Sequence, residues 1–404
     1  MKILWVKSDF LHPADRGGHI RTLEMLKCLH RRHEIHYVAF DDGKNAEGLD
    51  RSSEYCSRAY PVTHSVPPHR SLRFMGQLFE GFFSPVPVAV ERYTSARMRR
   101  RIEEVLEQQM FDTLVCDFLF PAPNLPDVSR SVLFQHNVES MIWRRHVEHA
   151  NNPVKKAYFE LQAQRMHVFE ESICRRAGQI IAVSEADRGT MQRLFGVERV
   201  TSIETGVDTA YFTPCAAATP KEKPVVADLI FTGSMDWLPN IDAMQFFAAE
   251  VLPHIRKKRP DCRLVVAGRR PTSVVQELAK RDSGIIVTGT VPDIRPYLWG
   301  SRVSVVPLRI GGGTRLKIFE AMAARVPVVS TSIGAEGLPL QHGKDIAIAD
   351  SPELFARCCL DLLADADLRG HRANQAWDVV SSRFSWEAVS KEFESALEAG
   401  PRPN

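Results

Sequence analysis

The chain of 404 residues lacks an excess of charge of either sign. Its 52 Lys and Arg stand against 49 Asp and Glu, which gives a net charge of +3 at pH 7. A protein whose main task is to neutralise nucleic acid concentrates far more positive charge, so we expect no nucleic-acid partner. Apolar residues make up 44% of the chain, too many for a mostly disordered protein. The length predicts two or three folded domains.

Cysteine motifs and long apolar runs are also missing. The eight cysteines include no C-x-x-C pair, so neither a zinc site nor a dithiol redox site is indicated. Their scattered positions predict reduced thiols and a cytoplasmic protein. The apolar run after Met1 is too short for a signal peptide. No stretch approaches 18 residues without a charge, so we expect no transmembrane helix.

Three common nucleotide and metal motifs are absent. The dinucleotide fingerprint G-x-G-x-x-G fails, because Leu316 stands where the glycine after Gly311 and Gly313 belongs. No Gly-Lys pair continues into the Ser or Thr of a P-loop, and no H-E-x-x-H occurs. The sequence therefore supports neither nicotinamide nor P-loop chemistry, and it offers no metalloprotease site.

The first half of the chain alternates short apolar runs with longer amphipathic stretches. Runs of three to six Val, Ile, Leu and Phe residues predict buried strands. Apolar residues from Ile20 to Leu29 recur at helical spacing. Strand, helix and strand in succession predict a parallel sheet. The predicted strands are Ile3–Val6, Ile35–Phe40, Leu114–Cys116, Val132–Phe134 and Ile180–Val183, and the predicted helices are His19–His30 and Val154–Arg176.

A segment without apolar periodicity interrupts the chain at residues 213–224. It contains three prolines and several charges, which is typical of a linker. We therefore predict a domain over residues 1–212, a linker over 213–224 and a second domain over 225–383. The helical residues 384–404 form a C-terminal helix that we expect to pack back on the first domain.

A second series of strands and helices follows the linker. The order predicts an α/β protein with two Rossmann-like domains that face each other across a cleft. Open parallel sheets bind ligands beyond the carboxyl ends of their strands, so the cleft is the expected site. The predicted strands are Leu229–Thr232, Leu264–Ala267, Ile285–Val287, Val303–Val306 and Val326–Thr331, and the predicted helices are Asn240–Ile255 and Thr314–Ala324.

The most informative stretch is residues 303–331, a strand, a three-glycine turn, a helix and another strand. Glycines let the backbone approach a ligand closely, and the start of the helix offers unpaired N–H groups to an anion. Arg315 and Lys317 add positive charge there. Glu320 lies on the same helical face as Lys317, where its carboxylate can accept hydrogen bonds from a ribose diol. A turn followed by a helix with a solvated Lys317–Glu320 pair is the alternative.

The segment RLKIFEAMAARVPVVST resembles the donor site of family 4 glycosyltransferases, retaining enzymes with the GT-B fold. Glu320 matches their second glutamate, whereas Gly312 stands in place of the first and Arg325 in place of a glycine. The G-G-G-T-R-L-K version is typical of a bacterial subgroup. The resemblance implies that the second domain binds a nucleoside-diphosphate sugar through Gly233, Gly311, Gly312, Gly313, Thr314, Arg315, Lys317 and Glu320.

The same resemblance assigns roles in the first domain. It places Gly17 and Gly18, which open a helix, beside acceptor and phosphate. It makes His136, just after a predicted strand, the catalytic residue that approaches the transferred sugar. An imidazole can hydrogen-bond a sugar hydroxyl and stabilise positive charge at the reacting carbon. A loop histidine that satisfies local backbone groups is the alternative, and Glu139 either orients His136 or faces solvent.

Other candidate residues carry weaker signals. Asp9 and His12 favour local structural roles, and Arg21 is a weak candidate. Ser184 and Glu185 follow a strand, where a serine N-cap alone would explain them. Glu336 either faces the donor or caps a turn. The segment TGTVPD at residues 288–293 resembles the family's nucleobase contact.

Five arginines between Arg92 and Arg101 follow an aromatic stretch. Basic residues beside aromatic ones can dock on an anionic membrane surface. An ordinary helix with a solvated basic face is the alternative, and we favour it. A peripheral contact at the inner membrane face therefore remains a secondary expectation.

The resemblance implies a function. We expect transfer of a sugar, with retention, from a nucleoside-diphosphate sugar to a carbohydrate, lipid-linked or small-molecule acceptor in bacterial polysaccharide or glycoconjugate synthesis. No cofactor and no metal are expected. Two alternatives stay open: a sugar-nucleotide epimerase, and a non-catalytic protein that binds a nucleotide sugar.

Overall fold

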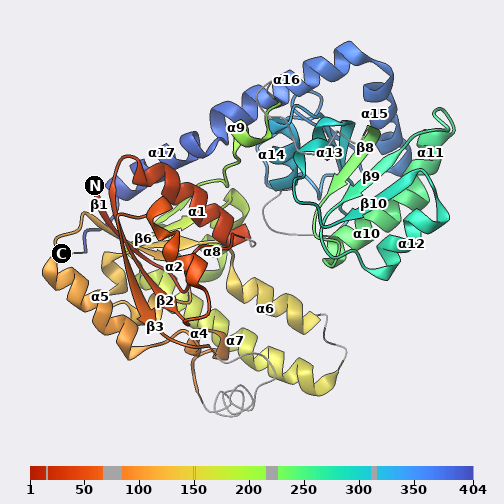
Figure 1. Ribbon diagram of the computed structural model, residues 1–404. Helices are drawn as coiled ribbons and strands as arrows, with labels where there is room; N and C mark the ends of the chain where they lie inside the picture. Colours follow the sequence, from red (N-terminus) through yellow and green to blue (C-terminus); the bar gives the residue numbers. More distant parts are fainter. Residues whose placement is uncertain are drawn as a thin grey trace. The chain divides into compact units, whose positions relative to one another are not determined.

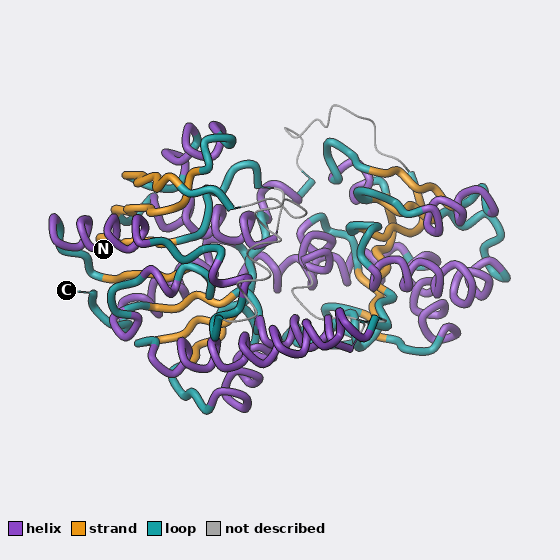
Figure 2. The backbone as a smooth tube through the Cα atoms, turned by 90° about the horizontal axis from the view of Figure 1, so that it is seen from below, coloured by secondary structure: helices purple, strands orange, loops and turns teal. Residues whose placement is uncertain are grey.

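The computed structural model describes residues 1–14, 17–66, 84–148, 150, 152–214, 226–310 and 316–403. The chain divides into two compact units, of which the first comprises Met1–Thr205 and Val389–Asn404 and the second Gly206–Ala388. Each unit is built on a parallel sheet, and helices flank the strands (Figures 1 and 2).

In the described residues of the first unit, a seven-stranded sheet has the order β3-β2-β1-β4-β5-β6-β7. All neighbouring strands are parallel. Sequence reasoning missed two strands at the sheet's edges, because one alternates buried with exposed residues and the other is very short. The strands are β1 (Lys2–Val6), β2 (Glu34–Asp41), β3 (Arg58–Thr63), β4 (Thr113–Asp117), β5 (Val132–Gln135), β6 (Gln179–Ala182) and β7 (Val200–Ser202).

Helices cover the strands of this sheet. Asn152 caps the long helix α7, and Pro153 occupies its first turn, where the missing N–H of proline costs nothing. The predicted helix over Val154–Arg176 is therefore confirmed. The helices are α1 (Gly17–His30), α2 (Ala46–Asp50), α4 (Val88–Glu91), α5 (Ala96–Gln108), α6 (Glu139–Glu148), α7 (Pro153–Arg176) and α8 (Glu185–Phe195).

The C-terminal helix α17 (Trp386–Glu398) ends in the first unit. Its Phe393 is fully buried against Trp5 and Phe134, with ring centroids 5.7 and 4.9 Å away. Glu394 binds Arg32 at 2.8 Å. The end of the chain thus contributes to the hydrophobic core beneath β1 and β5.

In the described part of the second unit, a six-stranded parallel sheet has the order β10-β9-β8-β11-β12-β13. Its strands are β8 (Ala227–Thr232), β9 (Leu264–Ala267), β10 (Ile285–Gly289), β11 (Ser301–Val306), β12 (Val328–Ser330) and β13 (Ala347–Ile348). Its helices are α9 (Thr209–Phe212), α10 (Leu238–Phe246), α11 (Leu252–Arg256), α12 (Ser273–Arg281), α13 (Arg295–Trp299), α14 (Leu316–Ala323), α15 (Pro352–Ala364), α16 (Ala366–Arg383) and the start of α17.

One predicted helix of this unit is interrupted. The sequence predicts a helix over Asn240–Ile255, but α10 and α11 are separated by a π-helical stretch over Phe247–Val251. Pro253 lies in the first turn of α11. Proline lacks the N–H that a helix interior needs, so the regular α-helix cannot pass through it unchanged.

The chain before the predicted linker packs on the second unit. Phe212 lies in that unit's core, and its carbonyl accepts a hydrogen bond from Trp299 Nε1 at 2.7 Å. Trp377 Nε1 donates to Thr213 Oγ1 at 2.9 Å. The division between the units therefore falls after Thr205, earlier than the composition indicates. Residues 215–224 of the predicted linker lie outside the described residues.

Candidate functional site

A buried carboxylate organises the carboxyl edge of the first sheet. Asp117, the last residue of β4, is fully buried. Its Oδ1 accepts hydrogen bonds from Lys7 Nζ at 2.9 Å and from His136 Nε2 at 2.7 Å. Its Oδ2 accepts from Trp5 Nε1 at 2.9 Å and from Thr22 Oγ1 at 2.7 Å. Asp117 thus joins the ends of β1, β4 and β5 to helix α1.

The charges in this cluster set the state of His136. Burial by itself raises the pKa of Asp117, but Lys7 and His136 together bring it well below its usual range. Burial lowers the pKa of His136 to about 4, although Asp117 opposes this shift. The imidazole is therefore neutral at pH 7. Because an ionised carboxylate only accepts hydrogen bonds, we assign the proton to Nε2 and a lone pair to Nδ1.

Gly18 lies beside this lone pair. A Cβ atom at Gly18 would be 3.4 Å from His136 Nδ1, whereas one at Gly17 would meet nothing within 4 Å. Among the described residues, no hydrogen bond reaches Nδ1. The fold thus brings together two candidate residues, Gly18 and His136, that are far apart in the chain, and glycine lies beside the Nδ1 edge of the imidazole.

Glu139 does not orient His136. It is buried next to Glu170, whose carboxylate accepts the N–H groups of Glu139 at 2.9 Å and Ser140 at 2.8 Å and so caps α6. Burial, with the nearby charge of Glu170, raises the pKa of Glu139 to about 8. Burial likewise raises the pKa of Glu170 to about 7. The orienting carboxylate is Asp117, a residue that sequence reasoning missed.

The weaker candidates of the first unit have local partners. Ser184 Oγ accepts the N–H of Asp187 at 3.1 Å, which confirms the serine as the N-cap of α8. Arg21 is buried, and burial lowers its pKa to about 10 while the charge of Asp187 opposes the shift. His12 Nε2 lies 3.1 Å from a carboxylate oxygen of Glu54.

Two cavities lined by described residues of the first unit bear on its site. One, of about 310 Å³, opens at the carboxyl ends of β1, β2 and β3 and includes Asp9, Asp41 and Asp42 in its lining. We call it the acidic cavity. Asp9 Oδ2 binds His19 Nε2 at 2.9 Å there. The acidic cavity lies at the same edge of the sheet as the Asp117–His136 cluster.

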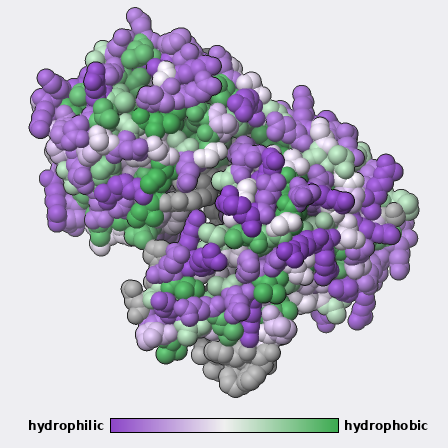
Figure 3. Space-filling model, turned by 180° about the vertical axis from the view of Figure 1, so that it is seen from behind, coloured by the Kyte–Doolittle hydropathy of each residue, from purple (hydrophilic) through white to green (hydrophobic). Residues whose placement is uncertain are grey.

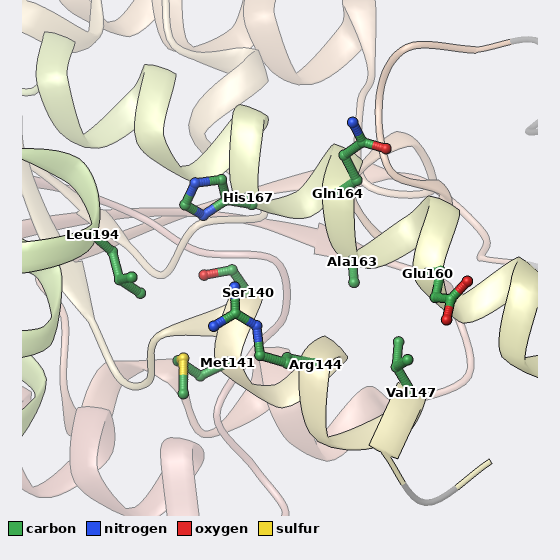
Figure 4. Close-up of a pocket in the computed structure, with 9 residues that line it drawn as sticks. All are labelled: Ser140, Met141, Arg144, Val147, Glu160, Ala163, Gln164, His167 and Leu194. Atoms are coloured by element: carbon green, nitrogen blue, oxygen red, sulfur yellow. The ribbon is translucent and has the colours of Figure 1, made fainter.

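The other cavity, of about 330 Å³, lies along the α6–α7 hairpin (Figure 4). Arg144 from α6, Glu160 and His167 from α7, and Leu194 from α8 are among its lining residues. Its lining includes no member of the Asp117–His136 cluster. The cavity is therefore separate from the Asp117–His136 cluster.

In the second unit, the predicted site residues Gly233 and Lys317 meet Asn240 after β8. Lys317 Nζ donates to Asn240 Oδ1 at 2.8 Å, and Asn240 Nδ2 donates to the carbonyl of Ser234 at 2.8 Å. Gly233 has a φ of +154°. A Cβ there would lie 2.7 Å from Asn240 Nδ2 and 2.9 Å from Lys317 Nζ. A side chain at this position would strain the backbone and displace these groups, so glycine leaves the backbone bare next to a cation.

Glu320 lies on α14, one turn after Lys317. Burial raises the pKa of this carboxyl, and the charge of Lys317 opposes the shift. Within the described residues, no hydrogen bond reaches the carboxylate, so it has acceptor capacity for a ligand. Gly311, Gly312, Gly313, Thr314 and Arg315 lie outside the described residues, and their role in binding phosphate stays a prediction.

The loop after β9 supports the same edge. A Cβ at Gly268 would lie 1.7 Å from the carbonyl oxygen of Gly233, and Arg269 Nε donates to Ser234 Oγ at 2.8 Å. Sequence reasoning missed these residues, although a Gly-Arg-Arg run directly after a buried strand was a usable signal. The segment at 288–293 begins in the last two residues of β10 and continues past it, and the exposed Glu336 follows β12 on this edge.

The arginine-rich helix α5 packs as an ordinary surface helix. Its Met98, Ile102 and Val105 are buried in the core, and its arginines are exposed. In the described residues, no helix has the length and apolarity to cross a membrane. Hydrophilic side chains dominate the face shown in Figure 3, with apolar ones between them in small groups. No three His, Cys, Asp or Glu side chains of the described chain gather as a metal site.

Each of the two units is an α/β fold with a parallel sheet and a polar cluster at the carboxyl ends of its strands. This architecture defines the fold class of the protein. Comparisons with solved structures give the fold. HepE of Anabaena in complex with UDP and glucose is 16% identical, with a TM-score of 0.66 over 99% of this chain and 100% of that one. Sucrose-phosphate synthase of Thermosynechococcus elongatus is 15% identical, with a TM-score of 0.64 over 99% and 98%. WaaG, a glycosyltransferase involved in lipopolysaccharide biosynthesis, is 13% identical, with a TM-score of 0.61 over 98% and 99%.

Family models match both units. Residues 16–211 match Glycosyltransferase Family 4, and residues 227–365 match Glycosyl transferases group 1. The chain belongs to the glycosyltransferases with the GT-B fold. It is also 22% identical, over 88% of its length and 89% of the relative's, to an uncharacterized 44.6 kDa protein in the cps region of Klebsiella pneumoniae.

Proposed function

We propose that the chain transfers a hexosyl group from a nucleoside-diphosphate sugar to an acceptor hydroxyl, with retention, in bacterial polysaccharide or glycoconjugate synthesis. The observation that carries the proposal is the cluster of Gly233, Asn240 and Lys317 at the carboxyl edge of the second sheet. It combines a cation with closely approachable backbone, which suits a diphosphate. The presence of UDP and glucose in the HepE structure supports the choice of ligand.

The chemistry follows from these groups. The bond between the anomeric carbon and the diphosphate oxygen breaks through a state with partial positive charge on the sugar ring. A bond forms from the acceptor oxygen to the same carbon, and the acceptor's proton passes to the leaving diphosphate. Lys317, with the predicted Arg315, stabilises the negative charge that develops on that leaving group. Glu320 accepts hydrogen bonds from the ribose.

The first unit binds the acceptor and supplies polar groups for the transferred sugar. The lone pair of His136 Nδ1 accepts a hydrogen bond from a sugar hydroxyl, and Gly18 leaves room for it. The neutral imidazole adds no positive charge beside the reacting carbon. The proposal needs no cofactor and no metal ion, so activity should persist in EDTA.

The test begins with binding. Thermal shift with UDP, GDP, ADP and dTDP should show stabilisation by at least one nucleotide, about 2.7 kcal/mol at a hundred times its dissociation constant. Lys317→Ala should weaken that nucleotide roughly tenfold or more, because a charge-assisted hydrogen bond is lost. Lys258→Ala removes an exposed lysine of the same unit and is the matched control.

Turnover then decides between transfer and mere binding. The corresponding nucleotide sugar should be hydrolysed slowly by the full chain, and NMR should show a free sugar that initially keeps the donor's anomeric configuration. A nucleotide that binds without any donor turnover would contradict the proposed enzyme. Inversion of the sugar would overturn retention alone.

A further inference from the structure

Hydrogen bonds hold the lining of the acidic cavity in place. His12 and Asn45 both line the cavity, and Asn45 Nδ2 donates to the carbonyl of His12 at 2.6 Å. Burial lowers the pKa of His12, so this ring adds no positive charge at neutral pH. This contact ties the loops after β1 and β2 together. The fold itself therefore forms the cavity. It lies at the edge of the sheet where α/β proteins bind ligands.

The cavity's carboxylates are hydrogen-bond acceptors, whereas Ser8, Asn45 and Tyr93 in its lining can also donate. Asp41 and Asp42 each use Oδ1 to accept one backbone N–H, from Gly43 and Lys44, at 2.9 Å. Among the described residues, no hydrogen bond reaches either Oδ2 atom. Neither lysine nor arginine occurs among the described residues of the lining. A hydroxyl or ammonium group of a ligand can therefore donate to these oxygens, whereas the carboxylates repel an anionic ligand.

Aromatic rings form the remaining wall. Phe40 and His64 pair with ring centroids 4.3 Å apart, and Tyr93 also lines the space. Ligand pockets combine such apolar surfaces with a few polar groups and span about 300–1,000 Å³. At about 310 Å³ the cavity is at the small end of that range. It has room for a single sugar ring. The hydroxyl groups of a sugar match the carboxylates of the lining, and the flat apolar face of its ring matches the aromatic wall.

We propose that the acidic cavity binds one monosaccharide unit of the acceptor, and that this unit is a neutral or amino sugar rather than an anionic one. Its hydroxyl or ammonium groups donate to Asp41 and Asp42, and its ring packs on the pair of Phe40 and His64. The inference rests on the proposed function, because it places the acceptor in the first unit.

Saturation-transfer NMR on the full chain tests the inference. The probes are D-glucose, D-galactose and D-mannose, their 2-amino counterparts and their uronic acids. At least one neutral or amino sugar should bind, and its uronic acid should bind at least about tenfold more weakly. The double variant Asp41→Asn with Asp42→Asn keeps both turns, since asparagine accepts the same N–H groups.

This variant should weaken the neutral or amino sugar about tenfold and reduce discrimination against its uronic acid. Asp50→Asn, at an exposed residue outside the lining, is the matched control and should change nothing. Equal binding of a uronic acid and its parent, an unaffected double variant, or a panel in which nothing binds would overturn the inference. Donor hydrolysis that persists in any of these cases would show that only the acceptor assignment has failed.

Discussion

The variant Asp117→Asn removes the charge that holds the first-unit site together. Oδ1 receives two donors, Lys7 and His136, and Oδ2 receives two others, Trp5 and Thr22. An amide of the same shape has one oxygen and one NH₂ group. In either orientation its NH₂ therefore faces two donors. The substitution breaks hydrogen bonds without changing the volume of the side chain.

The main energetic cost comes from Lys7, which is only 6% exposed. Removing one partner of a buried ion pair costs about 3–5 kcal/mol, because the other charge stays buried. A unit of this size loses about 2–4 °C in its midpoint per kcal/mol. We therefore expect the unfolding midpoint to fall by roughly 10 °C. Adding Lys7→Met to the Asp117→Asn variant should recover part of the loss, since no charge then stays unpaired.

The variant should also change the chemistry. Without the carboxylate, the proton of His136 is no longer held on Nε2, and the lone pair on Nδ1 is no longer guaranteed. Turnover of the donor should fall by roughly tenfold to a hundredfold, while nucleotide affinity, a property of the second unit, should not change. Scanning calorimetry, hydrolysis kinetics and nucleotide titration measure the three quantities. An unchanged midpoint together with unchanged turnover would refute this account of Asp117.

Three further predictions concern other residues of the two sites. Glu320→Gln should reduce the preference for a donor with a ribose over its 2′-deoxy analogue, as measured by competition; an unchanged preference would place Glu320 elsewhere. Gly233→Ala should weaken nucleotide binding and lower the midpoint, because a Cβ there meets Asn240 Nδ2 at 2.7 Å; wild-type values for both would show that the Asn240 and Lys317 side chains move aside easily. The pKa of Glu139, raised to about 8, means that the folded state holds a proton which the unfolded state loses, so its contribution to stability is lost as pH rises from about 4.3 through 8. Glu139→Gln should therefore lose less stability than the wild type between pH 5 and 8, which midpoints at the two pH values would check.

The sequence by itself determined the architecture of both units. Apolar runs such as Ile3–Val6 and Leu264–Ala267 became buried parallel strands, because residues that must avoid water reveal their burial through local pattern. Gly233, Lys317 and Glu320 could be named as candidates because the motif that marks them lies in neighbouring residues, and their binding roles stay predictions. Edge strands such as β3 escaped notice, since half of their residues face solvent.

Only the tertiary structure decided which groups act on one another. Asp117 looked like the polar end of an apolar run, yet its partner Trp5 lies 112 positions away in the chain and Lys7 lies 110 away. Glu139, the nearer carboxylate in sequence, turned out to lie beside Glu170, which accepts its backbone N–H, instead of orienting His136. Periodicity reports which face of an element is buried, but it carries no information about what that face meets. Hydrogen bonds and pKa values depend on distances of a few ångströms, and those distances exist only once the parallel strands have brought their ends to one edge of the sheet.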